Sequence, residues 1–330
     1  MERASPVLRR LRREPGPVVV HGGTVMRAGA AIEHLAINVP AGGWTQAAHL
    51  EPMAADALLM GSLPGAPIRL RAFYVDARIT VSIHRVPMRR RSTLLRGSKA
   101  AERIGASHAF VIPDQIERSR RLSHAWVVEE LLAPGRRATR AEWRHVIRDV
   151  ATGIGELWLR SDSRATSIRR VVPWLSSKEL VNLLRAMELE PTDRGRLLRR
   201  IDELAASQRE LLVGWTHGDP CVSNVLRLGG PRLGLVDWER AGRNPLGLDA
   251  CRMLAGLDDP TEAIAWIDDQ FQPLARGRIA PLREQAAISL LGLMPTWARQ
   301  GKSWKRAGRG EWYRTRNARR LALLEHLLEI

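Results

Sequence analysis

The sequence has few cysteines and no long hydrophobic run, and each absence excludes a class of protein. Among its 330 residues are only two cysteines, Cys221 and Cys251, which form no CxxC pair and have no metal-ligand spacing. A disulfide scaffold is therefore excluded. No apolar run approaches the roughly 18 residues of a transmembrane helix. The basic stretch 9–13 is followed by Pro15 and Gly16 rather than by an apolar segment, so we expect no secretory signal and a cytoplasmic protein.

Lysine is also scarce, and the basic charge is carried almost entirely by arginine. Only four of the 52 basic residues are lysines, which leaves 48 arginines. The net charge of +17 is spread evenly, with 19 basic and 11 acidic residues up to residue 132 and 33 and 24 beyond it. Nucleic-acid-binding proteins usually concentrate their charge on one patch or arm. The even distribution therefore argues against a nucleic-acid partner.

The order of local patterns predicts a two-lobed α+β protein. The first 60 residues show no clear pattern, but 68–75 and 79–86 have the character of strands. A helix is predicted over 93–104, and a strand over 125–132 ends at a Pro-Gly break. We therefore expect a β-rich N-lobe over residues 1–132.

Beyond this break the patterns are helical. Thr139 and Glu142 have the spacing of a capping box, and apolar residues follow at helical intervals. Further helices are predicted over 177–187, 193–206, 261–274, 280–293 and 314–329. These patterns predict a larger helical C-lobe over residues 133–330.

The stretch 217–239 carries the strongest chemical signal. Two apolar runs, 225–228 and 233–236, flank a Gly-Gly-Pro-Arg loop and predict a β-hairpin. In a register symmetric about that loop, Asn224 faces Asp237 at the open end of the hairpin. Asp219 lies five residues before Asn224.

These oxygen-bearing side chains suit phosphoryl transfer. Asn224 and Asp237 could hold Mg²⁺, a hard cation that takes oxygen ligands. Asp219 could orient an acceptor hydroxyl and accept its proton. The alternative is a surface hairpin with polar ends, where Asp and Asn are common.

The motif His217-Gly218-Asp219, followed by Asn224 and by Asp237-Trp238-Glu239, resembles that of the aminoglycoside phosphotransferase and choline kinase-like family. The resemblance implies a protein-kinase-like fold with nucleotide bound between the lobes. It implies that Asp219 is the catalytic base and that Asn224 and Asp237 bind Mg²⁺. It also implies supporting roles for His217 and for Asp249, although Asp249 could equally cap a helix.

The same resemblance assigns the nucleotide site, and here the sequence departs from the family pattern. Glu129, Glu130 and Leu131 would form the inter-lobe hinge beside the adenine, or simply continue a core strand. Arg85 stands where a phosphate-binding lysine is expected, and it could instead be a solvated strand residue. Two further residues are candidates for the nucleotide site. Gly65 could belong to a phosphate-binding loop, and Glu102 could be the partner of the missing lysine.

The acceptor is the least determined part of the reaction. The resemblance implies a small-molecule O-phosphotransferase that moves the terminal phosphate of ATP or GTP to a hydroxyl of an aminoglycoside-, sugar- or amino-alcohol-like acceptor. The segment 299–320 has nine basic residues and one acidic residue, with aromatic residues between them. It could contact an anionic partner or a membrane surface, or be a solvated helix face. The alternative function is a pseudokinase-like binding module that grips nucleotide weakly and acts through these basic segments.

Overall fold

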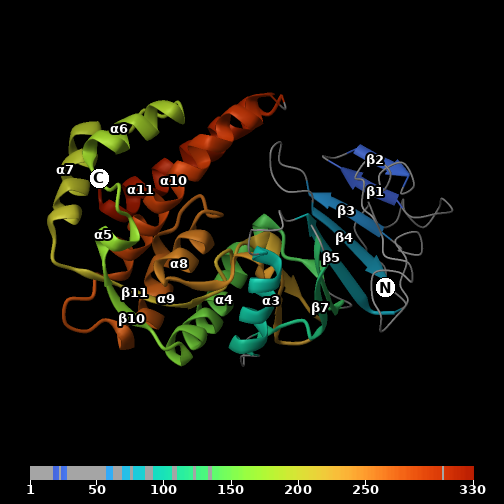
Figure 1. Ribbon diagram of the computed structural model, residues 1–330. Helices are drawn as coiled ribbons and strands as arrows, with labels where there is room; N and C mark the ends of the chain where they lie inside the picture. Colours follow the sequence, from blue (N-terminus) through green and yellow to red (C-terminus); the bar gives the residue numbers. More distant parts are fainter. Residues whose placement is uncertain are drawn as a thin grey trace.

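The fold is described from a computed structural model. It describes residues 18–21, 24–27, 57–61, 69–74, 77–85, 92–105, 110–121, 124–132, 136–306 and 308–330. None of the helices in these ranges is long and apolar enough to span a membrane. Figure 1 shows a large sheet on one side of the molecule and most of the helices on the other.

The large sheet has seven strands in the order β2-β1-β3-β4-β5-β8-β7. All neighbouring strands are antiparallel except β1 and β3, which are parallel. The strands expected over 68–75, 79–86 and 125–132 are confirmed as β4, β5 and β8. The bounds are β1 Val18–His21, β2 Thr24–Arg27, β3 Ala57–Gly61, β4 Arg69–Tyr74, β5 Ile79–Arg85, β7 Gln115–Arg121 and β8 His124–Glu130.

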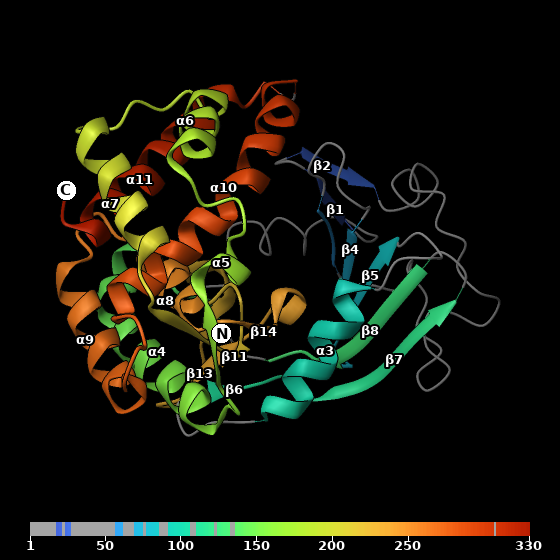
Figure 2. The same ribbon diagram turned by 60° about the vertical axis from the view of Figure 1, so that its left-hand side comes forward.

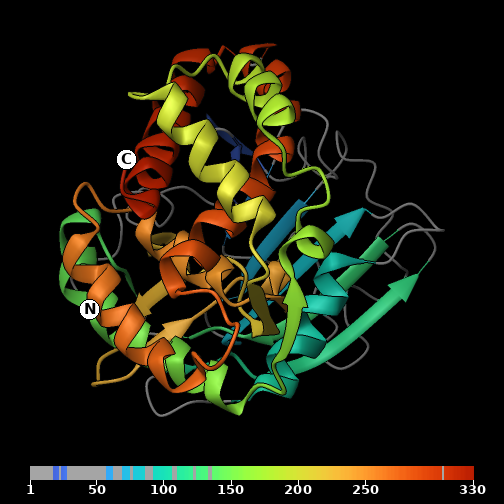
Figure 3. The same cartoon turned by 90° about the vertical axis from the view of Figure 1, so that its left-hand side faces the viewer.

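Helix α3, Thr93–Ile104, connects this sheet with the rest of the molecule. It packs against β7 and β8 on one side, as the turned views show (Figure 2 and Figure 3), and against the turn η3, Trp238–Arg240, on the other. The contact with η3 is close, because a Cβ at Gly97 would lie 2.0 Å from the carbonyl oxygen of Trp238. Only glycine permits this approach, which fixes α3 next to the 237–239 segment.

The C-terminal region is mainly helical, as the sequence predicts. The capping box of α4 is formed, with Thr139 and Glu142 each bonded to the other's backbone N–H. The bounds are α4 Arg140–Arg160, α5 Ile168–Val171, α6 Ser177–Ala186, α7 Arg194–Ala206, α8 Gly247–Leu254, α9 Thr261–Phe271, η4 Gln272–Leu274, α10 Leu282–Arg306 and α11 Gly310–Leu328.

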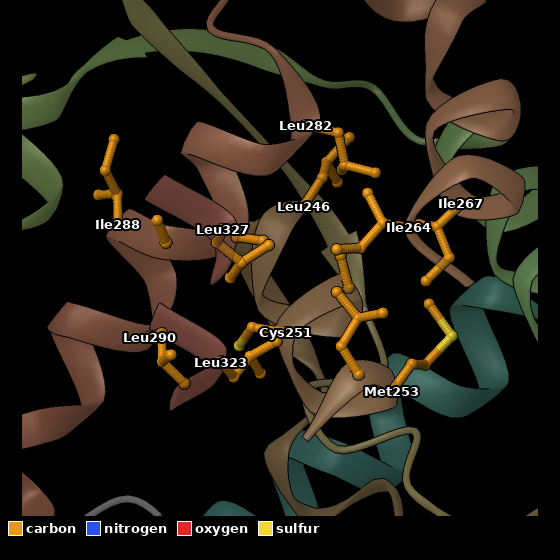
Figure 4. Close-up of a cluster of buried hydrophobic side chains, with 14 of the residues drawn as sticks. Leu246, Cys251, Met253, Ile264, Ile267, Leu282, Ile288, Leu290, Leu323 and Leu327 are labelled. Atoms are coloured by element: carbon orange, nitrogen blue, oxygen red, sulfur yellow. The ribbon is translucent and has the colours of Figure 1, made fainter. Parts of the chain in front are cut away.

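The helices share one hydrophobic core. Side chains of α8, α9, α10 and α11 meet in it (Figure 4), and Cys251 of α8 lies in this cluster together with Leu323 of α11. Burial of this apolar surface is the main force that holds α10 against both α8 and α11. Cys251 is fully buried and Cys221 half-buried, and both are free thiols.

Two small sheets carry the motif residues. One has the order β10-β11-β14 and the other β6-β13-β12-β9. The predicted hairpin is present as β12 and β13, but its register is shifted by one residue. Val225 pairs with Leu235, because the loop has five residues, 228–232, and is centred on Gly230. The bounds are β6 Phe110–Val111, β9 Arg136–Arg137, β10 Arg164–Ser167, β11 Glu210–Thr216, β12 Val225–Arg227, β13 Leu233–Leu235 and β14 Gly242–Pro245.

Candidate active site

The loop that follows β11 is held by a buried carboxylate. Asp249 of α8 accepts the backbone N–H of His217 at 3.1 Å and that of Gly218 at 2.7 Å. Burial raises the pKa of Asp249 to about 7, and the two N–H donors oppose this rise. Asp249 is therefore bonded to the loop before Asp219 and makes no cap bond to its own helix.

His217 joins this loop to the end of the hairpin. Its Nδ1 accepts the backbone N–H of Asp219 at 3.2 Å, and its Nε2 donates to the carbonyl of Val236 at 3.1 Å. The ring is fully buried and makes an edge contact with Trp238. Burial lowers the pKa of His217, which favours the neutral ring that these two bonds require.

One backbone hydrogen bond joins Asn224 to the residue that precedes Asp237. The N–H of Val236 donates to the carbonyl of Asn224 at 3.0 Å. Asn224 ends the turn η2, Val222–Asn224, and its Nδ2 donates to the carbonyl of Asp219 at 2.9 Å. Asp237 has a left-handed backbone, φ 69°, which few residues other than glycine, Asn and Asp adopt readily. The register shift therefore leaves the two side chains at the same end of the hairpin.

The structure places a cation on Asp237 that the sequence did not single out. Nη2 of Arg71, from β4, lies 3.4 Å from Oδ1 of Asp237, and its Nε donates to Ser82 of β5 at 3.0 Å. The side chain of Arg71 is 17% exposed. Burial opposes its charge, but Asp237, Glu129 and Glu239 raise the pKa of Arg71 above its ordinary value.

Arg71 and Asp237 line a pocket between the sheet, α3 and η3. Glu129 of β8 enters it, and burial raises the pKa of Glu129 despite the neighbouring Arg71. Its lining residues are Arg71, Ser82, Leu94, Ser98, Gln115, Val127, Glu129, Asp237, Trp238 and Glu239. Just outside this lining, His84 Nε2 lies 2.8 Å from Glu239.

Two hinge candidates have partners within the fold. Glu130 pairs with Arg78 at 3.8 Å, outside the pocket. The backbone N–H of Leu131 donates to the carbonyl of Arg78 at 2.8 Å. This N–H is therefore used within the fold, and the assignment of residues 129–131 to the adenine-binding hinge stays a prediction.

Of the remaining candidates for the nucleotide site, only Glu102 has a described side chain, and it does not line the pocket. Glu102 is exposed and pairs with Arg118 of β7, because it lies one turn beyond Ser98 along α3. Gly65 lies outside the described residues, and for Arg85 only the backbone, at the end of β5, is described.

Two arginines flank the carboxylate of Asp219. Nε of Arg252, from α8, lies 3.6 Å from Oδ1, and Nε of Arg240, from η3, lies 3.7 Å from Oδ2. Asp219 is part-exposed, at 23%, whereas Arg252 is buried. The carboxylate is thus accessible and has positive charge on both sides.

Comparison with known proteins identifies the family to which the sequence belongs. The sequence model of APH, the phosphotransferase enzyme family, matches residues 8–282. No curated protein sequence matches significantly.

Solved structures share the architecture at low sequence identity. A thermostable mutant of aminoglycoside phosphotransferase APH(4)-Ia, in complex with ADP and hygromycin B, is 13% identical with a TM-score of 0.50, and the match covers 90% of this chain and 98% of that one. Choline kinase LicA from Streptococcus pneumoniae is 11% identical with a TM-score of 0.47, over 77% and 89%. The expected two-lobed, kinase-like fold is confirmed by the first of these.

Proposed function

Since the chain belongs to the phosphotransferase enzyme family, we propose that it transfers the terminal phosphate of ATP or GTP to a hydroxyl group of a small molecule. The bond between the terminal phosphorus and its bridging oxygen breaks, and a bond forms to the acceptor oxygen. Asp219 accepts the proton of that hydroxyl, and the nucleoside diphosphate leaves. We place this reaction in the cytoplasm, where both nucleotides are supplied.

The arrangement around Asp219 is the observation that carries this proposal. Asp249 fixes the backbone before Asp219, and His217 accepts the N–H of Asp219 itself. The same histidine donates to Val236, the residue before Asp237. A proton acceptor and a second carboxylate are therefore held by one buried network, which suits a reaction that depends on positioning.

Asp237 and Asn224 are the residues that would hold Mg²⁺. Nδ2 of Asn224 donates a hydrogen bond to the Asp219 carbonyl, which leaves Oδ1 as the atom that would bind the metal. This Oδ1 accepts a long hydrogen bond, 3.3 Å, from Ser223. The carboxylate of Asp237 is 36% exposed. An amide oxygen and a carboxylate fit Mg²⁺, which completes its shell with water and phosphate oxygens. When bound, Mg²⁺ would neutralise charge on the nucleotide phosphates.

We assign phosphate binding to Arg71. Its planar guanidinium can bind two phosphate oxygens at once, and it lies on the same pocket as Asp237. In this proposal Arg71 exchanges its contact with Asp237 for the nucleotide phosphates, which frees the Asp237 carboxylate for Mg²⁺. Arg71, from β4, thus takes the role that the sequence suggested for Arg85 of β5.

The proposal is tested by nucleotide consumption. The protein is incubated with Mg²⁺, ATP and a mixture of polyols, sugars and sugar derivatives, and release of ADP is measured. We expect acceptor-dependent ADP release that falls about 10²–10⁴-fold in Asp219→Asn. Asp202→Asn, an exposed position on α7, is the matched control and should be unchanged. Equal rates in the Asp219→Asn variant and the wild type would overturn the role of Asp219.

A further inference from the structure

Two arginines lie against the carboxylate of Asp219, and two more lie within electrostatic range of both of them; we call these four the arginine cluster. They are Arg240 of η3, Arg252 of α8, and Arg316 and Arg320 of α11. Arg316 and Arg320 are four residues apart and so lie on one face of α11. In Figure 4, Cys251 of α8 and Leu323 of α11 lie in one apolar cluster, and Arg252 follows Cys251 directly in α8.

Arg252 is the buried member of the cluster and is incompletely paired. Its side chain is 9% exposed, and its Nε and Nη2 atoms are buried without a hydrogen-bond partner. The contact of Nε with Asp219, at 3.6 Å, is longer than a hydrogen bond. A buried guanidinium with unpaired N–H groups costs free energy unless another acceptor reaches it. Arg252 therefore has donors available beside Asp219.

Arg316 and Arg320 are held by aromatic rings. The guanidinium of Arg320 lies 3.7 Å from the ring centre of Trp297, and that of Arg316 lies 5.0 Å from Trp312. Stacking holds the face of the planar guanidinium group against the ring. The N–H donors remain at the edge of the guanidinium group. Nη1 of Arg320 donates to Asn317. Both side chains are thus oriented by the protein before any ligand binds.

The positive charges of the cluster act on one another. Desolvation, and then Arg316 and Arg252, lower the pKa of Arg320 to about 9. Although Arg316 is exposed, desolvation and then Arg252 lower the pKa of its guanidinium, and Asp219 opposes this. Desolvation is thus the main cause of both shifts, and the neighbouring guanidinium groups act in the same direction.

Two other acidic side chains in this region are engaged elsewhere. Glu188 pairs with Lys305 and Arg314. The carboxylate of Asp249 accepts two backbone N–H groups. Two guanidinium groups thus contact the Asp219 carboxylate and two more lie near them, so an incoming cation would be repelled.

We infer that the acceptor carries an anionic oxygen group, a phosphate or a carboxylate, in addition to its reacting hydroxyl, and that the arginine cluster binds this group. The inference rests on the proposed phosphotransferase function and names its substrate class. Arg252, Arg316 and Arg320 would bind the anion, and the hydroxyl would then lie at Asp219. A polycationic acceptor does not fit this surface.

The test compares four small probes that share one polyol framework. Glycerol phosphate, glycerate, glycerol and serinol carry a phosphate, a carboxylate, no charge and an ammonium group. Each is titrated by calorimetry into the full chain saturated with Mg²⁺ and AMP-PNP, so that the nucleotide site is filled. The preceding AMP-PNP titration reports separately on the proposed function, since failure to bind nucleotide would count against that function alone.

We expect the two anions to bind about tenfold or more tightly than glycerol, and serinol to bind most weakly, because charge-assisted hydrogen bonds contribute about 1.5–3 kcal/mol. Arg316→Gln and Arg320→Gln should each remove most of this preference and leave AMP-PNP affinity unchanged. Arg319→Gln, an exposed change on the same helix, should alter neither. The inference is overturned if the anions bind no more tightly than glycerol, or if the preference survives in both cluster variants. The phosphate and carboxylate arms show which anion is preferred.

Discussion

The guanidinium of Arg71 lies 3.4 Å from the carboxylate of Asp237, although the two residues are 166 positions apart in the chain. Arg71 comes from the large sheet, and Asp237 follows the hairpin of the helical region. The ion pair therefore crosses from one lobe to the other inside the candidate nucleotide pocket. A nucleotide that binds both side chains would therefore change this contact between the lobes.

The first prediction concerns the phosphates that Arg71 would bind. Arg71→Ala should weaken ATP binding by about 10–100-fold, because it removes a charge-assisted contact, and should leave AMP binding nearly unchanged. Arg71→Lys should recover part of the loss, since lysine keeps the charge but not the fork of donors. Titrations of AMP, ADP and ATP measure these effects. Arg85→Ala is the comparison, and a larger loss there than in Arg71→Ala would return the role to Arg85.

The second prediction concerns Asp249. Asp249→Ala leaves the backbone N–H groups of His217 and Gly218 without their acceptor, which costs about 1–3 kcal/mol for each buried group. We expect a lower melting temperature and a kcat reduced at least tenfold, with KM for ATP little changed. Asp249→Asn, which keeps one acceptor oxygen, should be intermediate. A variant as stable and as active as the wild type would show that this carboxylate does not position the loop.

The third prediction concerns the close approach at Gly97. Gly97→Ala places a methyl group 2.0 Å from the Trp238 carbonyl, so α3 or η3 must move. We expect destabilisation of about 1–3 kcal/mol and weaker nucleotide binding, measured by urea unfolding and calorimetry. Gly195→Ala in α7, where the nearest atoms are 3.7 Å away, is the control. It should be neutral or slightly stabilising, because alanine favours helix. Equal behaviour of the two variants would contradict the packing described.

The fourth prediction concerns pH. Burial lowers the pKa of His217 in the folded protein, whereas the unfolded chain takes up this proton near pH 6.5. The unfolded state therefore binds more protons below that pH, so the contribution of His217 to stability is present above about pH 6.5 and declines as the pH falls. His217→Gln should show a shallower loss of stability between pH 7.5 and 5 in urea unfolding. His145→Gln, an exposed histidine of α4, should keep the wild-type slope, and a wild-type slope in His217→Gln would refute the assignment.

Local signals in the sequence predict much of the fold. The capping box at Thr139 and the strands β4 and β5 depend on neighbouring residues, and all three are present. The hairpin register was wrong by one residue, because the sequence does not show whether Leu228 belongs to the strand or to the loop. An odd loop length moves the centre of symmetry by half a residue.

The arginine residues of the site could not be predicted from local signals in the sequence. With 48 arginines in the chain, no single one stands out. The pairing of Arg71 with Ser82 follows from the β4–β5 register, but its contact with Asp237 depends on the long-range packing of α3 on η3. Similarly, Arg316 and Arg320 belong to the basic segment 299–320, and only the packing of α8 and α11 on α10 brings them near Arg252.

Calorimetric titration of AMP-PNP tests the central claim most directly. It is performed with Mg²⁺ and with EDTA, on the wild type and on Asp237→Ala. We predict saturable binding at one site in the wild type that weakens strongly without Mg²⁺ and in Asp237→Ala, because Asp237 is assigned as the metal-binding carboxylate. Absence of binding to a folded wild-type protein, or binding that is unaffected by both Mg²⁺ and Asp237→Ala, would contradict the account.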